Sequence, residues 1–268
     1  MRSLPLPDAL ATTALAFRGY NVANLGRTPE LLDHPAYGSV VQDALREASD
    51  VCRLATGRPC DLVTRVRKRE ETRGLDTYAE DIALIAGASV AQMRLLELHF
   101  NAPMSRAKLA FGYSLGEASA LIAAGVFEMK HLLRVPLALA DDCVALADGV
   151  IMGVLFSRGP TFDLGAVERL CLEINQMGEG VIGVSAILSP NCVLLLGQGT
   201  TLDHFQARLR ERISGPVTLR RNPNRWPPLH TPITWQRAIP NRAAVMLHAM
   251  PGGMIAPPLP IISGVTGK

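Results

Sequence analysis

Residues 109–120 read LAFGYSLGEASA, and this stretch decides how the middle of the chain is expected to fold. The apolar run that ends at Gly112 is typical of a central strand, and the small residues after Gly116 are typical of a closely packed helix. Between them, the pattern Gly-Tyr-Ser-Leu-Gly predicts a tight turn that carries Ser114. In such a turn the serine oxygen can be raised into a cleft.

The chemistry of a serine hydroxyl makes this turn a candidate catalytic site. A hydroxyl is a poor nucleophile at neutral pH and needs a base. Gly112 and Gly116 would let neighbouring backbone pass close by, and the amides of the following helix, including that of Leu115, could stabilise an oxyanion. The alternative is a chance Gly-x-Ser-x-Gly in a chain that has 23 glycines. The strand before Ser114 and the helix after it favour the nucleophile.

The base is less well defined by sequence, because six histidines are spread along the chain. His230 lies in PPLHTPI, a proline-flanked loop, and His34 follows a helix-like turn in LLDHPAYG. Histidines on helices are more typical of surface or core positions, and this applies to His99, His131, His204 and His248. Loop position favours His230, but spacing alone does not decide.

Bulk composition excludes several classes of function. The 268 residues are 48% apolar and carry a formal net charge of only +3, too small to indicate nucleic-acid binding. No uncharged apolar run is long enough to span a bilayer, the N-terminus lacks the features of a signal peptide, and no metal-ligand spacing occurs. Five scattered cysteines without a CxxC pair predict a cytoplasmic protein. The basic stretch at 65–73 mixes both signs and is expected to be a solvated face.

Hydrophobic periodicity predicts the main elements. A short buried strand is expected within 12–20, and Thr77 with Glu80 forms a capping-box pattern at the start of a long buried helix. From 149 to 220 the strand and helix patterns alternate as β-α-β-β-α-β, the order of a ferredoxin-like unit. The other expected elements are a helix at 39–57, the long helix at 77–100, a strand at 107–113 and a helix at 116–127.

Beyond the residues themselves, three segments resemble a known family. GYSLGEASALIAAGVF (112–127) resembles the nucleophile segment of malonyl-CoA:acyl-carrier-protein transacylases and polyketide-synthase acyltransferase domains. LHTPI (229–233) is similar to that family's catalytic histidine motif, and PLPIISGVTGK (258–268) to a later strand. The likeness covers nearly the whole chain.

The resemblance implies an α/β fold with two parts. These are an α/β-hydrolase-like parallel sheet, formed by 1–148 plus 221–268, and an inserted ferredoxin-like subdomain at 149–220. It also implies that Ser114 attacks an acyl-CoA thioester while His230 takes the proton. The acyl group would then pass to the phosphopantetheine thiol of an acyl carrier protein.

The resemblance also bears on ligands and partners. Acyl-CoA is the expected substrate, the partner carries phosphopantetheine, and no permanently bound cofactor, metal, nucleic acid or membrane is expected. Arg106 and Lys108, beside the nucleophile strand, are candidates for the CoA phosphates, with solvated surface charge as the alternative. Glu117 matches the family's glutamate, and a structural role at the helix start competes evenly there.

Several positions depart from the family pattern. Tyr20 stands where a glutamine helps to form the oxyanion hole, although its backbone amide could still donate alongside that of Leu115. Leu139 stands where the family has the arginine that pairs with the malonyl carboxylate, while Arg134 lies five residues earlier. A pocket without that cation should disfavour a carboxylate, so either a non-carboxylated acyl group or weak malonyl transfer is predicted. The expected acyl-pocket residues are Tyr113, Leu139, Leu188 and Leu229.

Two other functions remain open from sequence. The same Ser114 and His230 could hydrolyse acyl thioesters, with water replacing the carrier thiol. A degenerate acyltransferase without activity could instead bind a carrier protein or complete a larger synthase. The altered residues Tyr20 and Leu139, and a sequence that stops at SGVTGK where the family continues with a segment that orients the histidine, motivate this last reading.

Overall fold

The computed structural model describes residues 9–72, 74–222 and 224–268. The chain divides into two compact units. The first contains Met1–Arg73, Thr77–Ala138 and Val245–Lys268, and the second contains Gly74–Asp76 and Leu139–Ala244. The predicted subdomain boundaries at 149 and 220 stay a prediction.

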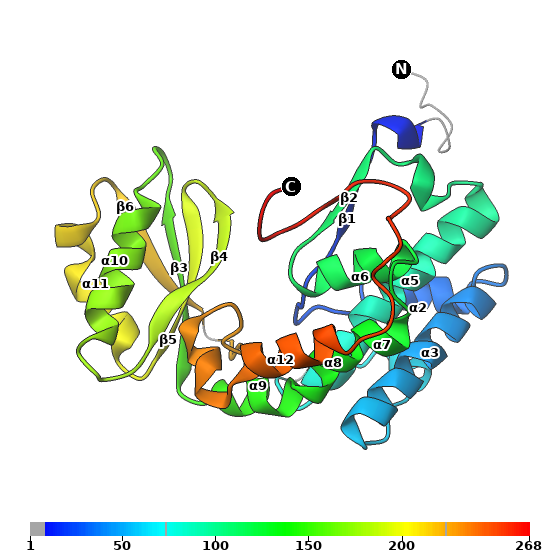
Figure 1. Cartoon of the computed structure of the whole chain (residues 1–268), viewed down its shortest axis with the longest axis horizontal. Helices are drawn as coiled ribbons and strands as arrows, with labels where there is room; N and C mark the ends of the chain where they lie inside the picture. Colours follow the sequence, from blue (N-terminus) through cyan, green and yellow to red (C-terminus); the bar gives the residue numbers. More distant parts are fainter. Residues whose placement is uncertain (1–8, 73, 223) are drawn as a thin grey trace. The chain divides into compact units, whose positions relative to one another are not determined.

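A short parallel sheet forms the centre of the first unit (Figure 1). Strands β1 (Ala14–Phe17), β2 (Leu109–Gly112) and β7 (Ile261–Ile262) lie in the order β1-β2-β7. Both neighbours run parallel to β2, the strand predicted from LAFG. The expected strand within 12–20 is confirmed, and the expected late strand is present as two residues. This parallel arrangement places the carboxyl ends of β1 and β2 at the same edge, where a site can form.

Two long helices make up most of the first unit's helical packing. Helix α5 (Tyr78–Phe100) and helix α3 (Gly38–Thr56) pack closely, and a Cβ on Gly87 of α5 would lie 2.9 Å from the Cβ of Ala48. Both helices are confirmed at the expected positions. By length and composition α5 could cross a membrane, but 61% of its apolar window is buried inside the protein. That burial is typical of a core helix in a soluble protein.

The remaining helical elements of the first unit are short. They are η1 (Leu10–Thr12), α2 (Thr28–Asp33), α4 (Leu62–Arg67), η2 (Met104–Arg106), α6 (Leu115–Ala123), α7 (Met129–Leu132) and α8 (Arg134–Ala138). The division between the units crosses α12 (Ile239–His248).

A buried ion pair corrects two expectations from sequence. Arg65, expected on a solvated face, is only 5% exposed and donates at 2.5 Å to the fully buried Asp81. Thr77 does not cap α5 with its side chain, because its hydroxyl donates to Asp81 instead. Asn24 and Thr72 also donate to this carboxylate, each at 2.7 Å. Asp81 therefore ties three separate segments to the start of α5.

The balance of forces on Asp81 explains why this cluster matters for stability. Burial raises the pKa of the Asp81 carboxyl, while the hydrogen bonds from Thr72 and Arg65 oppose that rise. A buried ion pair adds little net stability, but removing one partner leaves the other charge uncompensated.

The second unit contains an antiparallel sheet covered on one face by two helices (Figure 1). Its strands lie in the order β4-β5-β3-β6, and every neighbouring pair is antiparallel. This confirms the predicted β-α-β-β-α-β arrangement. Phe205 and Leu155 are fully buried between the helices and the sheet. The elements are β3 (Val150–Ser157), α10 (Leu164–Asn175), β4 (Ile182–Ser189), β5 (Cys192–Gln198), α11 (Thr201–Arg212) and β6 (Val217–Asn222), with α9 (Ala140–Leu146) and η3 (Pro232–Arg237) completing the unit.

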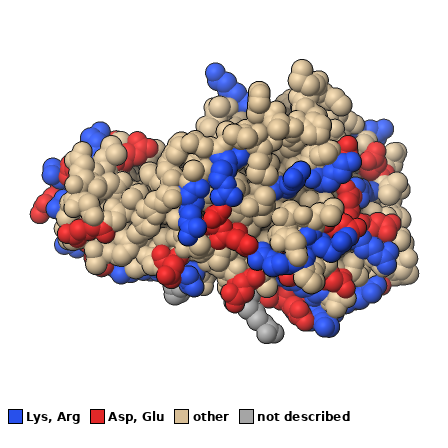
Figure 2. All heavy atoms as spheres, turned by 60° about the horizontal axis from the view of Figure 1, so that its bottom comes forward, with Lys and Arg blue, Asp and Glu red and all other residues tan. Residues whose placement is uncertain are grey.

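Surface charges of opposite sign are interspersed. Figure 2 shows Lys and Arg side chains mixed with Asp and Glu on the face that it draws. Some of these exposed charges form ion pairs. Arg94 pairs with Glu47 at 2.8 Å, and Arg53 pairs with Asp50 at 2.9 Å. Each such exposed pair contributes little to stability.

Replacing Asp81 with alanine is expected to destabilise the protein strongly. The substitution leaves the Arg65 guanidinium buried without its carboxylate, which costs about 3–5 kcal/mol in the free energy of unfolding. The matched control is Asp50→Ala, which breaks the exposed pair with Arg53 and should cost less than about 1 kcal/mol. Urea unfolding followed by circular dichroism measures both. Equal losses in the two variants would contradict a structural role for the buried pair.

Candidate active site

Ser114 occupies a strained turn between β2 and α6. Its backbone angles are φ 54° and ψ −115°, in a region that non-glycine residues rarely adopt. Strand β2 ends at Gly112 and helix α6 begins at Leu115, so the serine lies at the junction itself. Such strain costs of order 1–3 kcal/mol and persists only where surrounding structure enforces it. This is the strand–turn–helix geometry predicted for a serine nucleophile.

The two glycines of the pattern are required by close backbone contacts. A Cβ on Gly112 would overlap with the backbone of Gly116. A Cβ on Gly116 would overlap with the carbonyl of Phe17, the last residue of β1. The nucleophile turn is therefore folded tightly on itself and pressed against the end of the neighbouring strand.

The loop after β1 approaches the same turn. The Tyr113 amide donates to the Phe17 carbonyl, with an N···O distance of 3.4 Å. A Cβ on Gly19 would lie 2.6 Å from the Tyr113 carbonyl oxygen. The structure thus brings the segments of the two predicted oxyanion donors, Tyr20 and Leu115, to the Ser114 turn. The start of α6 also adds the positive end of a helix dipole there.

The side chain of Tyr20 packs inward behind this loop. Its ring meets the Tyr78 ring edge-on, with centroids 4.8 Å apart. Burial and the neighbouring Asp81 carboxylate raise the pKa of the Tyr20 phenol well above its usual range, so the side chain stays neutral. The tyrosine therefore anchors the loop against α5, and only its backbone amide remains a candidate oxyanion donor.

Glu117 links the start of α6 to the segment after β7. Its carboxylate accepts a hydrogen bond from the Gly264 amide at 3.1 Å. Of the two roles that the sequence left open for Glu117, this contact supports the structural one.

His230 lies in the second unit, in a turn supported by β4. Its φ of 61° is unusual for a non-glycine residue. The Ser185 hydroxyl donates to the Leu229 carbonyl at 2.9 Å, and a Cβ on Gly183 would lie 2.7 Å from the Pro232 ring. Partial burial lowers the pKa of the His230 imidazole below its usual value. The lowered pKa favours the neutral form of the ring, which a general base requires.

The predicted acyl-pocket residues are divided between the units. Tyr113 lies in the first unit and is 46% exposed. The other three belong to the second unit: Leu139 is buried at the start of α9, Leu188 on β4 is 55% exposed, and Leu229 is half-buried. Whether they form one pocket with Ser114 stays a prediction.

The two cations proposed for CoA phosphates lie away from the nucleophile. Arg106 ends η2, and Lys108 directly precedes β2. Both are exposed and sit at the amino end of that strand, whereas Ser114 follows its carboxyl end. At about 3.3 Å of rise per residue, the four-residue strand alone separates them by roughly 13 Å. The structure does not bring them to the nucleophile turn.

Sequence reasoning missed the groups that support the site. Ser185 holds the His230 turn, and no motif in the sequence marks it. Asp81 and Thr72 lie behind the oxyanion loop with no motif to mark them. Among the described residues, no group of three or more His, Cys, Asp or Glu side chains could hold a metal ion.

The fold defines the class of protein to which this chain is similar. That fold is α/β, with a parallel sheet that carries a serine turn and an antiparallel ferredoxin-like sheet. No protein-family model matches the chain, and no curated protein sequence matches it. Solved structures do match.

The matching structures are malonyl-CoA:acyl-carrier-protein transacylases and a related synthase domain. FabD from Acinetobacter baumannii is 24% identical with a TM-score of 0.71, over 95% of this chain and 73% of that one. The transacylase in the PlMCAT:AntF complex with a type II polyketide acyl carrier protein is 24% identical, with a TM-score of 0.71 over 96% and 75%. The acyltransferase domain from the second module of the salinomycin polyketide synthase is 22% identical, with a TM-score of 0.65 over 96% and 54%. At these identities the likeness establishes a shared fold, which is the fold that the resemblance predicted.

Substitution of Gly116 tests the tight turn. Gly116→Ala places a methyl group against the Phe17 carbonyl and should lower the free energy of unfolding by about 1–3 kcal/mol. Gly159→Ala is the matched control, because nothing lies within 4 Å of a Cβ there. It should change stability by less than about 0.5 kcal/mol. Chemical unfolding measures both, and an unchanged Gly116→Ala variant would contradict the close approach of β1 to the turn.

Proposed function

We propose that this protein is an acyltransferase that moves an acyl group from acyl-CoA, through an ester on Ser114, to the phosphopantetheine thiol of an acyl carrier protein. The observation that carries the proposal is the strained Ser114 turn between β2 and α6. It occurs in a chain with the transacylase fold. Function follows from this site, because fold alone does not imply activity.

Each half-reaction uses the same groups. The Ser114 oxygen attacks the thioester carbonyl while His230 accepts the hydroxyl proton, and the backbone amides of Leu115 and Tyr20 donate to the oxyanion. The carbon–sulfur bond then breaks, and His230 returns the proton to the CoA thiolate. In the second half the carrier thiol loses its proton to His230 and attacks the ester carbonyl. The ester carbon–oxygen bond then breaks, and His230 returns that proton to the Ser114 oxygen.

The proposed acyl group lacks a carboxylate. Leu139 is buried and apolar at the position where the resembling family has an arginine. Arg134 does not take the place of the missing arginine. It begins α8, and it lines a cavity with Val51 and Leu54 of α3. A malonyl carboxylate buried without a cation would be strongly disfavoured.

The proposed partner is an acyl carrier protein. One matching solved structure is a complex of a type II polyketide acyl carrier protein with its malonyl-transacylase, which supports this assignment by analogy. The proposal places the reaction in the cytoplasm with no permanently bound cofactor. All five cysteines are free thiols, as a reducing compartment favours.

Intact-mass measurement tests the proposal directly. Incubation with acetyl-, butyryl- and malonyl-CoA should add one acyl mass to the wild type and none to Ser114→Ala. Exposed Ser39 provides the control, and Ser39→Ala should be acylated normally. Holo carrier protein should then take the acyl group from the enzyme. We expect acetyl or butyryl transfer to match or exceed malonyl transfer, and a strong malonyl preference would contradict the predicted specificity.

The same assay separates the alternatives. Release of free acid at an equal rate with and without carrier protein would establish a hydrolase instead. Absence of acylation with every acyl-CoA, together with no labelling of Ser114 by a fluorophosphonate, would establish a non-catalytic protein.

The pH dependence of acylation reports on His230. The neutral imidazole is the active base, and partial burial lowers its pKa from the usual 6.5. The rate should therefore fall as the imidazole becomes protonated, with its half-maximal value below pH 6.5. The initial rate of acylation between pH 5 and 8, measured by quenched mass spectrometry, checks this. A half-maximal rate above pH 6.5 would contradict a base whose pKa is lowered.

A further inference from the structure

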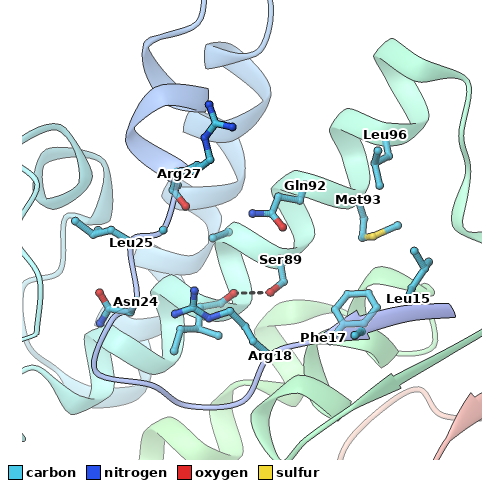
Figure 3. Close-up of a pocket in the computed structure, with 15 residues that line it drawn as sticks. Leu15, Phe17, Arg18, Asn24, Leu25, Arg27, Ser89, Gln92, Met93 and Leu96 are labelled. Atoms are coloured by element: carbon cyan, nitrogen blue, oxygen red, sulfur yellow. Dashed lines mark hydrogen bonds between the residues drawn. The ribbon is translucent and has the colours of Figure 1, made fainter. Parts of the chain in front are cut away.

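A cavity of about 270 Å³ lies in the first unit between β1, the loop at 24–28 and helix α5 (Figure 3). Neither Ser114 nor any other residue of the nucleophile turn lines it. Its volume is close to the lower end of the range for small-molecule sites, roughly 300–1,000 Å³. It is therefore a site separate from the proposed catalytic centre.

One end of the cavity is apolar. Leu15 and Phe17 alternate along β1, so they project from the same face of the strand. Met93 and Leu96 lie three residues apart on α5, on one face of that helix. Figure 3 shows these four side chains gathered at the same side of the cavity. This wall fits an aliphatic chain.

The middle of the cavity carries one cation that has no carboxylate partner among the described residues. Arg18 donates to the Ala23 carbonyl at 2.7 Å, which fixes its guanidinium beside the loop. Burial lowers the pKa of Arg18, and this effect outweighs the opposing attraction of Glu71. The Glu71 carboxylate itself accepts from the backbone amides of Asn24 and Leu25. It does not line the cavity.

The second arginine at the cavity is already neutralised. Arg27 donates to Glu30 at 2.5 Å and its side chain is 84% exposed. Among the other polar groups, the Asn24 amide nitrogen donates to Thr72 and Asp81, and the Ser89 hydroxyl donates to the Ile85 carbonyl. The buried Asn24 Oδ1 has no hydrogen-bond partner among the described residues, and Gln92 adds a second amide to the lining. Arg18, which is solvent-exposed, is thus the lining cation without an ion pair among the described residues, and it lies beside an apolar wall.

We propose that this cavity binds an aliphatic carboxylate of medium chain length, with its head group on Arg18 and its chain along Leu15, Phe17 and Met93. A guanidinium matches a carboxylate in shape as well as charge. A single carboxylate balances a single arginine, whereas a phosphate dianion would need a second free cation. This inference does not depend on the proposed acyltransferase activity.

Titration calorimetry with octanoate tests the site, using Ser114→Ala so that no acyl chemistry can contribute. We expect saturable binding that weakens at high salt, and at least about tenfold weaker binding of neutral 1-octanol. Arg18→Gln should weaken octanoate binding by a similar factor. Arg27→Gln is the matched control, since it removes an equal charge that Glu30 already neutralises, and it should change the dissociation constant less than about twofold.

A second variant tests the chain position. Met93→Trp fills the apolar end and should abolish binding of octanoate and 1-octanol alike. Circular dichroism confirms that each variant is folded before it is titrated. Absence of octanoate binding at millimolar concentration would overturn the proposal. So would equal affinity for 1-octanol, or equal losses in Arg18→Gln and Arg27→Gln. Failure of Ser114 acylation would overturn the proposed function and leave this result unaffected.

Discussion

The close approach of the end of β1 to the Ser114 turn is the constraint on which the candidate site depends. Gly116 lies against the Phe17 carbonyl, and Gly19 lies against the Tyr113 carbonyl. Backbone packed this tightly leaves no room for the turn to relax into a common conformation. The unfavourable φ of Ser114 is therefore held by neighbouring strands. The same contacts place the loop after β1 beside the serine, so the candidate nucleophile and the candidate oxyanion loop are fixed together.

The oxyanion loop is held from behind by buried polar groups. Tyr20 packs on Tyr78, and Asn24 four residues later donates to Asp81 at the start of α5. Asp81 in turn is paired with Arg65. A buried charge with several donors tolerates little displacement, because any movement leaves a polar group unsatisfied. The loop therefore gains rigidity from α5, and its backbone can be presented to the serine without the side chain that the resembling family uses there.

Sequence predicted those features that local pattern determines. The glycines around Ser114, the helix at 77–100 and the strand and helix order of the ferredoxin-like unit follow from spacing within a few residues. Features that depend on distant partners could not be predicted. Arg65 sits in a run of mixed charge and is buried only because Asp81, sixteen residues away, meets it. Ser185 supports the His230 turn across forty-four residues. No periodicity marks either pairing.

Strand β1 borders both the Ser114 turn and the cavity lined by Arg18, and the direction of its backbone and side chains keeps these two places separate. The carbonyl of Phe17 faces the Ser114 turn, whereas its ring lines the cavity with Leu15. At the next residue the Arg18 side chain enters the cavity, and Gly19 then returns the backbone to the turn. Because side chain and main chain project in different directions, one short segment contributes backbone to the candidate catalytic turn and side chains to the cavity. A ligand on Arg18 would thus contact the segment that positions the oxyanion loop without entering the nucleophile turn.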